Sequence, residues 1–239
     1  MVAALIGVCL LGVAFYIHHV DHQAKIKDER HYVSTLAAGV RARIEGELNS
    51  SIHLGLGIST YVAANPNFNA DSFNRVVASL VHYGRHLKTI TMAPGNVVRY
   101  VYPLAGNERL LGLRYQATSH DHEVSLEESR HPELIGPIDL VQGGRGMVHR
   151  LPLFVFDQAG NESYWGTATI ALDINSLLQA AGLEVHGPVL SYALRRLDAR
   201  GHAEMISGDS ALFSRNPVLL DISLDGQSFW QLASIPTNG

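Results

Sequence analysis

The chain has 239 residues, a hydrophobic share of 46% and a formal net charge of −4 at pH 7, which is typical of a globular protein with one or two domains. The mildly acidic balance gives no electrostatic reason to expect a nucleic-acid partner. The single cysteine, Cys9, excludes an intramolecular disulfide.

The N-terminal run from Met1 to Ile17 contains no charged side chain. In a helix it would span roughly 25 Å, at the short end of a membrane crossing. A cleaved signal peptide would need a basic start and a small-residue cleavage site, which are not found, and a buried core helix would usually carry a polar face. We therefore predict a transmembrane anchor over residues 1–19. The basic residues Lys25, Lys27 and Arg30 leave its orientation open.

A stripe of apolar residues follows the anchor at spacings of three and four, and no helix stop precedes Asn65-Pro66. The helix is therefore expected to continue as a stalk over residues 20–64. The stripe is compatible with pairing of two stalks in a homodimer and with packing of the stalk on its own domain. Its members are Val33, Ala37, Val40, Ile44, Leu48, Ile52 and Leu56.

Beyond the stalk, the pattern predicts an α+β chain. Asp71 is a candidate N-cap for a helix that reaches Val81, and residues 88–92 and 97–102 are expected to form a hairpin. Further strands are predicted at 150–156, 164–172, 189–197, 203–206, 218–224 and 228–235, and helices at 121–130 and 174–183. Because the last block consists almost only of strands, we predict two lobes, residues 65–173 and 174–239, joined through the second helix.

No constellation in the sequence supports catalysis or metal binding. His82 and His86 lie four residues apart, and His120 and His122 form a second pair, but neither an HExxH motif nor cysteine ligands accompany them. The run Gly143-Gly144-Arg145-Gly146 lacks the Lys-Ser/Thr pair and the following helix of a P-loop, so a hairpin turn is predicted there. We expect no catalytic residue, no metal and no cofactor.

Aromatic residues are more informative. Tyr100, Tyr102, Tyr115 and Trp165 lie on or near predicted strands, close in sequence to Arg114. An aromatic-lined sheet with one guanidinium group would suit a small-molecule pocket. The alternative is that these aromatics are ordinary core residues and the arginine is a surface residue.

The order of turn and strand motifs over about residues 50 to 239 resembles that of CHASE domains. No single motif is specific, whereas their shared order over this length is. The motifs are Pro94-Gly95-Asn96-Val97-Val98, Tyr100-Val101-Tyr102-Pro103-Leu104, Gly106-Asn107-Glu108, Leu111-Gly112, Gly136-Pro137, Gln142-Gly143-Gly144, Arg150-Leu151-Pro152-Leu153-Phe154, Tyr164-Trp165-Gly166 and Trp230-Gln231-Leu232-Ala233-Ser234-Ile235-Pro236.

The resemblance implies an extracytoplasmic sensor of a histidine kinase, an adenylate cyclase or a diguanylate cyclase. Such sensors carry two PAS-like lobes with antiparallel sheets on a long helix, are often dimeric and hold the ligand in the membrane-distal lobe. The resemblance also places the residues after Ile17 outside an inner membrane, in the periplasm or extracellular space. Plant relatives bind cytokinin through a carboxylate, but Pro103-Leu104-Ala105 stands at that point here, so cytokinin is not expected.

The expected function is therefore ligand sensing in the distal lobe, with a conformational signal passed through the stalk to a cytoplasmic kinase or cyclase outside this sequence. A membrane-anchored protein-interaction module without a small-molecule ligand is the alternative, and a periplasmic hydrolase is the weakest. The expected ligand-binding residues are Tyr100, Tyr102, Arg114, Tyr115, Ile135, Leu153 and Trp165.

Overall fold

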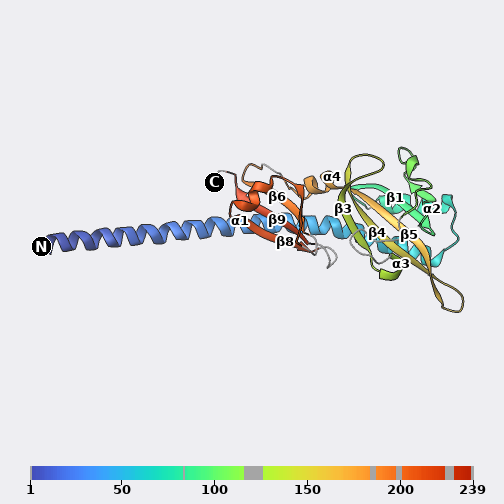
Figure 1. Cartoon of the computed structure of the whole chain (residues 1–239), viewed down its shortest axis with the longest axis horizontal. Coiled ribbons are helices and arrows are strands. Elements are labelled where there is room, and N and C mark those ends of the chain that lie inside the picture. Colours follow the sequence, from blue (N-terminus) through green and yellow to red (C-terminus); the bar gives the residue numbers. More distant parts are fainter. Residues whose placement is uncertain are drawn as a thin grey trace.

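A 63-residue helix, α1 (Val2–Ala64), carries two antiparallel sheets along its length in the computed structural model. Its N-terminal part projects beyond both sheets (Figure 1). The structure describes residues 2–82, 84–115, 126–183, 187–197, 201–223 and 229–237. Where side chains are described, no helix is both long and apolar enough to cross a membrane. The side chains of residues 1–14, most of the predicted anchor, lie outside that part.

The helix α1 ends at Ala64, just before Asn65-Pro66, as predicted. The first five members of its predicted stripe, from Val33 to Leu48, are buried. The last member of the stripe is wrong, because Leu56 is 60% exposed and the buried apolar positions of this stretch are Leu54, Ile58 and Val62. The side chain of Ile52 lies outside the described part. A step of eight residues exceeds two turns of 3.6 residues each, so the step from Leu48 to Leu56 turns the side chain away from the sheets.

The first sheet, called the distal sheet because it packs on the C-terminal part of α1, has five strands in the order β2-β1-β5-β4-β3. Helix α2 (Ala70–Val81) precedes it and begins at the N-cap Asn69, whose side chain accepts a hydrogen bond from the Ser72 backbone N–H. Asp71 lies in the first turn of the helix, so the predicted N-cap was two residues late. The strands are β1 (Leu87–Pro94), β2 (Tyr100–Tyr102), β3 (Glu133–Asp139), β4 (Arg145–Phe156) and β5 (Glu162–Asp173).

The predicted hairpin is confirmed by the antiparallel pairing of β1 with β2, in which Ile90 faces Tyr102. The glycine-rich run is a hairpin turn between β3 and β4, as expected, and Gly143 has a φ of +95° there. Part of the predicted helix at 121–130 is present as α3 (Leu126–Ser129), and residues 116–125 lie outside the described chain.

Helix α4 (Ile174–Ala180) leads from the distal sheet to a second sheet, called the proximal sheet, whose order is β7-β6-β9-β8. All four strands predicted for this block are confirmed. They are β6 (Leu190–Leu197), β7 (Ala203–Ser207), β8 (Val218–Ser223) and β9 (Phe229–Pro236), and the short helix η2 (Ser210–Ser214) lies between β7 and β8.

One continuous hydrophobic core lies between α1 and both sheets. It includes Ile44 and Ile58 of α1, Ile90 and Leu153 of the distal sheet, and Trp230 of the proximal sheet. Burial of this apolar surface is the main favourable term in folding. The long helix is therefore a shared wall for both sheets, and each sheet keeps a second face that is turned away from it.

Candidate ligand-binding site

The two faces of the distal sheet differ in chemistry. Alternate residues of a strand point to opposite faces. On β5, Ala168 and Ile170 join the core against α1, whereas Thr167 and Thr169, which alternate with them, point to the other side. On β1, Ile90 belongs likewise to the core. The sheet thus has an apolar face that packs on α1 and a polar face that is turned away from it.

Four of the predicted site residues pack on the α1 side of the sheet: Tyr100, Tyr102, Leu153 and Trp165. The Tyr100 hydroxyl donates to the Phe68 carbonyl at 3.1 Å, and the Trp165 indole N–H donates to the Pro66 carbonyl at 3.1 Å. Their rings lie 4.7 and 5.6 Å from the Phe68 ring, in one aromatic cluster. These contacts join the distal sheet to the segment between α1 and α2.

The other three predicted residues are not part of this cluster. Arg114 is exposed and pairs with Val97 in an isolated bridge. Ile135 is buried on β3 and alternates with Leu134, which packs on the α1 side. Tyr115 is half-buried against the small cluster of Ala93, Val98, Val101 and Leu110. The structure therefore brings Tyr115 and Ile135 to the polar face and leaves Arg114 at the surface.

A cluster of polar side chains surrounds Tyr115 on the polar face. The Tyr115 hydroxyl lies 2.8 Å from the Thr91 hydroxyl, so the two are hydrogen-bonded. The Arg150 guanidinium lies 5.3 Å from the centroid of the Tyr115 ring, within range of a cation–π contact. Thr169 lies between Thr91 and Arg150 in the sheet, because it pairs with Thr91 on β1 and with Arg150 on β4. We call Thr91, Tyr115, Glu133, Arg150 and Thr169 the polar-face cluster.

Opposite charges meet within this cluster. The Arg150 Nη1 atom lies 3.9 Å from the Glu133 carboxylate, and the two side chains are only 16% and 14% exposed. A partly buried pair keeps more of its Coulomb attraction than a surface pair, but it also loses hydration. Two further polar atoms, Thr169 Oγ1 and Arg150 Nε, are buried without a hydrogen-bond partner among the described residues. A buried orphan of this kind costs about 1–3 kcal/mol unless water or a ligand satisfies it.

A second group of hydrogen bonds borders the cluster. The Tyr164 hydroxyl donates to Asn96 Oδ1 at 2.7 Å and lies 2.8 Å from the Thr167 hydroxyl, which also contacts Asn96 at 2.9 Å. Burial raises the pKa of Tyr164, with a smaller raising effect from Glu127, while the two hydrogen bonds and Arg150 oppose the rise. Tyr164 therefore stays a neutral donor at physiological pH, within the electrostatic reach of Arg150.

Close backbone packing fixes the position of Tyr164. Gly166, two residues after Tyr164, has a φ of +146°, and a Cβ atom there would lie 2.2 Å from the Ala93 carbonyl oxygen. Only glycine permits both the backbone angle and the close approach of β5 to the end of β1. This contact holds the edge of the polar face beside Asn96.

No feature of the sequence marked Thr91, Glu133 or Thr169 as a site residue, and Arg150 stood out only as part of a family motif. Threonine in a strand is ordinary by propensity, so neither threonine stands out from its neighbours. A usable signal was present in β5, where Thr167 and Thr169 alternate with the apolar Ala168 and Ile170. Such alternation predicts a polar face, although it does not say whether that face is exposed to solvent or covered.

The polar-face cluster has the groups of a binding site for a polar small molecule. No group of three or more His, Cys, Asp or Glu side chains that could hold a metal occurs among the described residues. The cluster offers a guanidinium, a carboxylate and hydroxyl groups, which together can bind a small molecule with both acidic and basic groups.

Comparison with known proteins supports a sensor fold. No protein-family model matches the sequence, and no curated protein matches it. Among solved structures, the extracellular ligand-binding receptor of Desulfohalobium retbaense matches with a TM-score of 0.66 and 12% identity, over 85% of this chain and 40% of that receptor. This chain thus spans less than half of the receptor's length.

Two shorter structures match over almost their whole length. The ligand-binding domain of the amino acid chemoreceptor PctC of Pseudomonas aeruginosa, in complex with GABA, has a TM-score of 0.56 and 12% identity, over 86% of this chain and 98% of that one. The sensor domain of the histidine kinase DctB of Vibrio cholerae has a TM-score of 0.52 and 8% identity, over 86% and 98%. At these identities the likeness shows that this chain shares the fold of these domains.

Proposed function

We propose that this chain is the extracytoplasmic ligand-sensing domain of a membrane receptor and that it binds a small zwitterionic metabolite, such as an amino acid, on the polar face of the distal sheet. The observation that carries the proposal is the pair of buried, unsatisfied polar atoms, Thr169 Oγ1 and Arg150 Nε, beside an ion pair. A bound carboxylate would satisfy Arg150, and a bound ammonium group would take Glu133 as its partner.

The comparisons support this ligand class without assigning it. The similar PctC domain was solved with GABA, and the domain of the chemoreceptor PctB, with a TM-score of 0.52, was solved with L-Gln. Both ligands are small zwitterions. A sealed, fully packed distal core would favour the protein-interaction alternative, and the partly buried charges of the polar-face cluster argue against it.

The remaining parts of the proposal concern the long helix. The uncharged N-terminal run supports a membrane anchor, and the 63-residue length of α1 supports a stalk that carries a conformational change. Pairing of two stalks in a homodimer and an output kinase or cyclase complete the proposed receptor. The narrower assignment to the CHASE family stays a prediction that rests on the order of sequence motifs.

Equilibrium binding tests the ligand site directly. Isothermal titration of the whole chain, purified in a mild detergent, against a panel of amino acids that includes GABA and L-glutamine should find at least one ligand. The Arg150→Gln variant should bind that ligand at least about tenfold more weakly, a loss of 1.4 kcal/mol or more, because a buried charge-assisted bond is removed.

The matched control is Arg109→Gln, which removes an exposed guanidinium from the same lobe. It should leave the affinity unchanged within twofold. Absence of binding by every member of the panel, or equal loss in both variants, would contradict the proposed site.

A further inference from the structure

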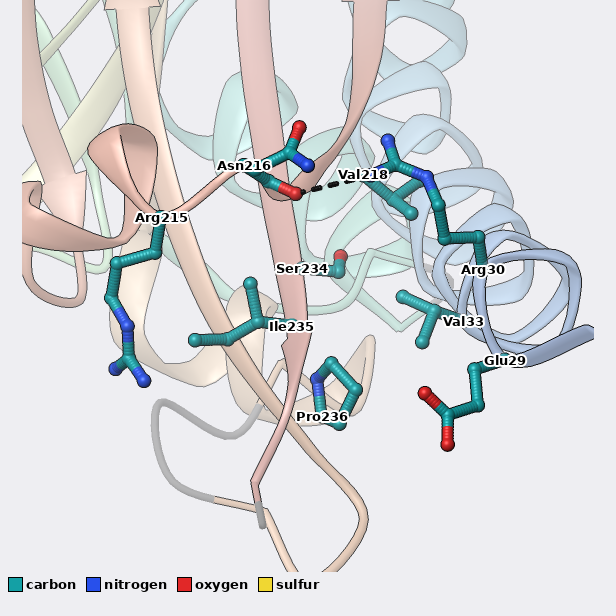
Figure 2. Close-up of a pocket in the computed structure, with 9 residues that line it drawn as sticks. All are labelled: Glu29, Arg30, Val33, Arg215, Asn216, Val218, Ser234, Ile235 and Pro236. Atoms are coloured by element: carbon teal, nitrogen blue, oxygen red, sulfur yellow. Dashed lines mark hydrogen bonds between the residues drawn. The ribbon is translucent and has the colours of Figure 1, made fainter. Parts of the chain in front are cut away.

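A cavity lies between α1 and the proximal sheet, far along the chain from the polar-face cluster. Its volume is about 200 Å³, and its lining comes from three parts of the fold (Figure 2). These are the exit of α1 from the lobe, the segment between η2 and β8, and the end of β9. The lining residues used below are Glu29, Arg30 and Val33 of α1, with Val218, Ser234 and Pro236 of the sheet.

A buried hydroxyl is the most informative group in this cavity. Ser234 is 1% exposed, and its Oγ atom has no hydrogen-bond partner among the described residues. Ser234 pairs with Val218 of β8. Its neighbour Ile235 packs on the face of the sheet that points away from α1, so Ser234 points toward α1. A hydroxyl on the α1 side would normally be replaced by an apolar residue or paired. Its orphan state indicates a group that the cavity is built to receive.

The charged groups stand at the two ends of the cavity. Figure 2 shows Arg30 extending toward Asn216, where its Nη1 atom donates to the carbonyl oxygen at 3.4 Å, and Glu29 near Pro236 at the other end. The contact to Asn216 is at the outer limit of a hydrogen bond, so it restrains Arg30 only weakly. Figure 2 also shows the Arg215 side chain directed away from Arg30.

Between these ends the walls are apolar. Val33 is 3% exposed and faces the cavity from α1, opposite Val218 and Pro236 of the sheet. The volume of about 200 Å³ is below the roughly 300–1,000 Å³ of pockets that bury drug-sized ligands, which favours a small ligand such as a short branched fatty acid.

We infer that this cavity is a second binding site, specific for a short-chain monocarboxylate such as isovalerate. The guanidinium of Arg30 and the hydroxyl of Ser234 hold the carboxylate, and the valines and Pro236 enclose the hydrocarbon part. Glu29 at the far end repels a second carboxylate, which excludes dicarboxylates such as succinate. The inference does not depend on the ligand proposed for the distal lobe.

A ligand at this place contacts α1 and β9 together. It would favour whichever arrangement of helix and sheet closes the cavity around it, and it would shift the balance of states only by its difference in affinity between them. The site is therefore suited to modulating the proximal lobe independently of the distal one.

Isothermal titration of the whole chain with isovalerate, isobutyrate and succinate tests the inference. Isovalerate and isobutyrate should bind, and succinate should bind at least tenfold more weakly than either. Arg30→Gln should weaken isovalerate binding at least tenfold, whereas the distal variants Arg109→Gln and Arg150→Gln should leave it within twofold of the unmodified chain.

A second variant separates ligand recognition from folding. Ser234→Ala removes the orphan hydroxyl, so the free protein should melt at the same temperature as the unmodified chain or higher, while its upward shift with isovalerate becomes smaller. Absence of binding by both monocarboxylates, tighter binding of succinate, or loss of isovalerate binding in Arg150→Gln but not in Arg30→Gln would each overturn the inference.

Discussion

Two threonines that face each other across β1 and β5 differ in one respect at the level of single atoms. Thr91 and Thr169 are 2% and 6% exposed, but among the described residues only the Thr91 hydroxyl has a hydrogen-bond partner, Tyr115 at 2.8 Å. Thr169→Val should therefore raise the free energy of unfolding by up to about 1 kcal/mol, because a buried orphan is removed. Thr91→Val should lower it by about 1 kcal/mol. Urea denaturation of the free protein measures both changes.

The comparison is controlled internally, because both variants replace the same side chain at paired positions of one sheet. Equal destabilisation by the two substitutions would mean that the Thr169 hydroxyl has a partner in the free protein. The Thr169 hydroxyl would then no longer support the proposed ligand site on the polar face.

Tyr164 provides a prediction about pH. Its pKa is raised in the folded state, chiefly by burial, so above pH ~10 the unfolded chain loses this proton before the folded chain does. The free energy of unfolding should thus fall as the pH rises through this alkaline range, and the contribution should be fully present below it. Tyr164→Phe should flatten the alkaline slope, as measured by urea denaturation at several pH values. An unchanged slope in the variant would contradict the assignment.

The limits of sequence reasoning are visible in the adjacent residues Tyr164 and Trp165. Both are aromatic and both lie on a correctly predicted strand, yet Tyr164 borders the polar face and Trp165 packs against Phe68 on the α1 side. Alternation predicts that neighbours point to opposite faces, but the sequence does not say which face α1 covers. That depends on long-range packing, so Tyr115 reaches the cluster while Tyr100 and Trp165 do not.

At the level of secondary structure, the elements with strong periodicity were predictable and β3 was not. The end of α1 and the four proximal strands follow from the apolar pattern and from turn residues. β3 contains Gly136-Pro137, which interrupts its register with β4 between Ile135 and Ile138. Proline is tolerated in a strand mainly at a sheet edge, and β3 is an edge strand. Edge position depends on strand order, which local sequence does not encode.

The packing of α1 gives a test at this scale. Ile44 is fully buried in the core, whereas Leu56, on the same helix, is 60% exposed. Ile44→Ala should lower the free energy of unfolding by about 2–5 kcal/mol through lost burial and the cavity left behind. Leu56→Ala should change it by less than about 0.5 kcal/mol, as at other exposed sites. Chemical denaturation followed by circular dichroism compares the two, and similar losses would contradict the observed face of the helix.

In the whole molecule, polar contacts as well as the apolar core connect the two sheets through α1. Arg43 of α1 donates from Nε to the carbonyl of Ala181, just after α4, at 2.7 Å. Close by on the helix, Glu47 lies 3.4 Å from His86, whose other ring nitrogen is 2.7 Å from the Ser176 hydroxyl of α4. The junction between the lobes is thus held by side chains from the helix, from the start of the distal sheet and from α4.

This connection predicts that the two lobes unfold together. The chain has two tryptophans, Trp165 in the distal sheet and Trp230 in the proximal sheet, so Trp230→Phe and Trp165→Phe each leave a fluorescent reporter in one lobe. Because both sheets share one core along α1, urea unfolding followed by tryptophan fluorescence should coincide, within each variant, with unfolding followed by far-ultraviolet circular dichroism. Adding Arg43→Ala should lower the midpoint in both variants, because the helix then loses its bond to the junction. A fluorescence transition that separates from the circular dichroism transition in either single variant would show that the lobes unfold independently, and a signal could then not pass between them through α1 alone.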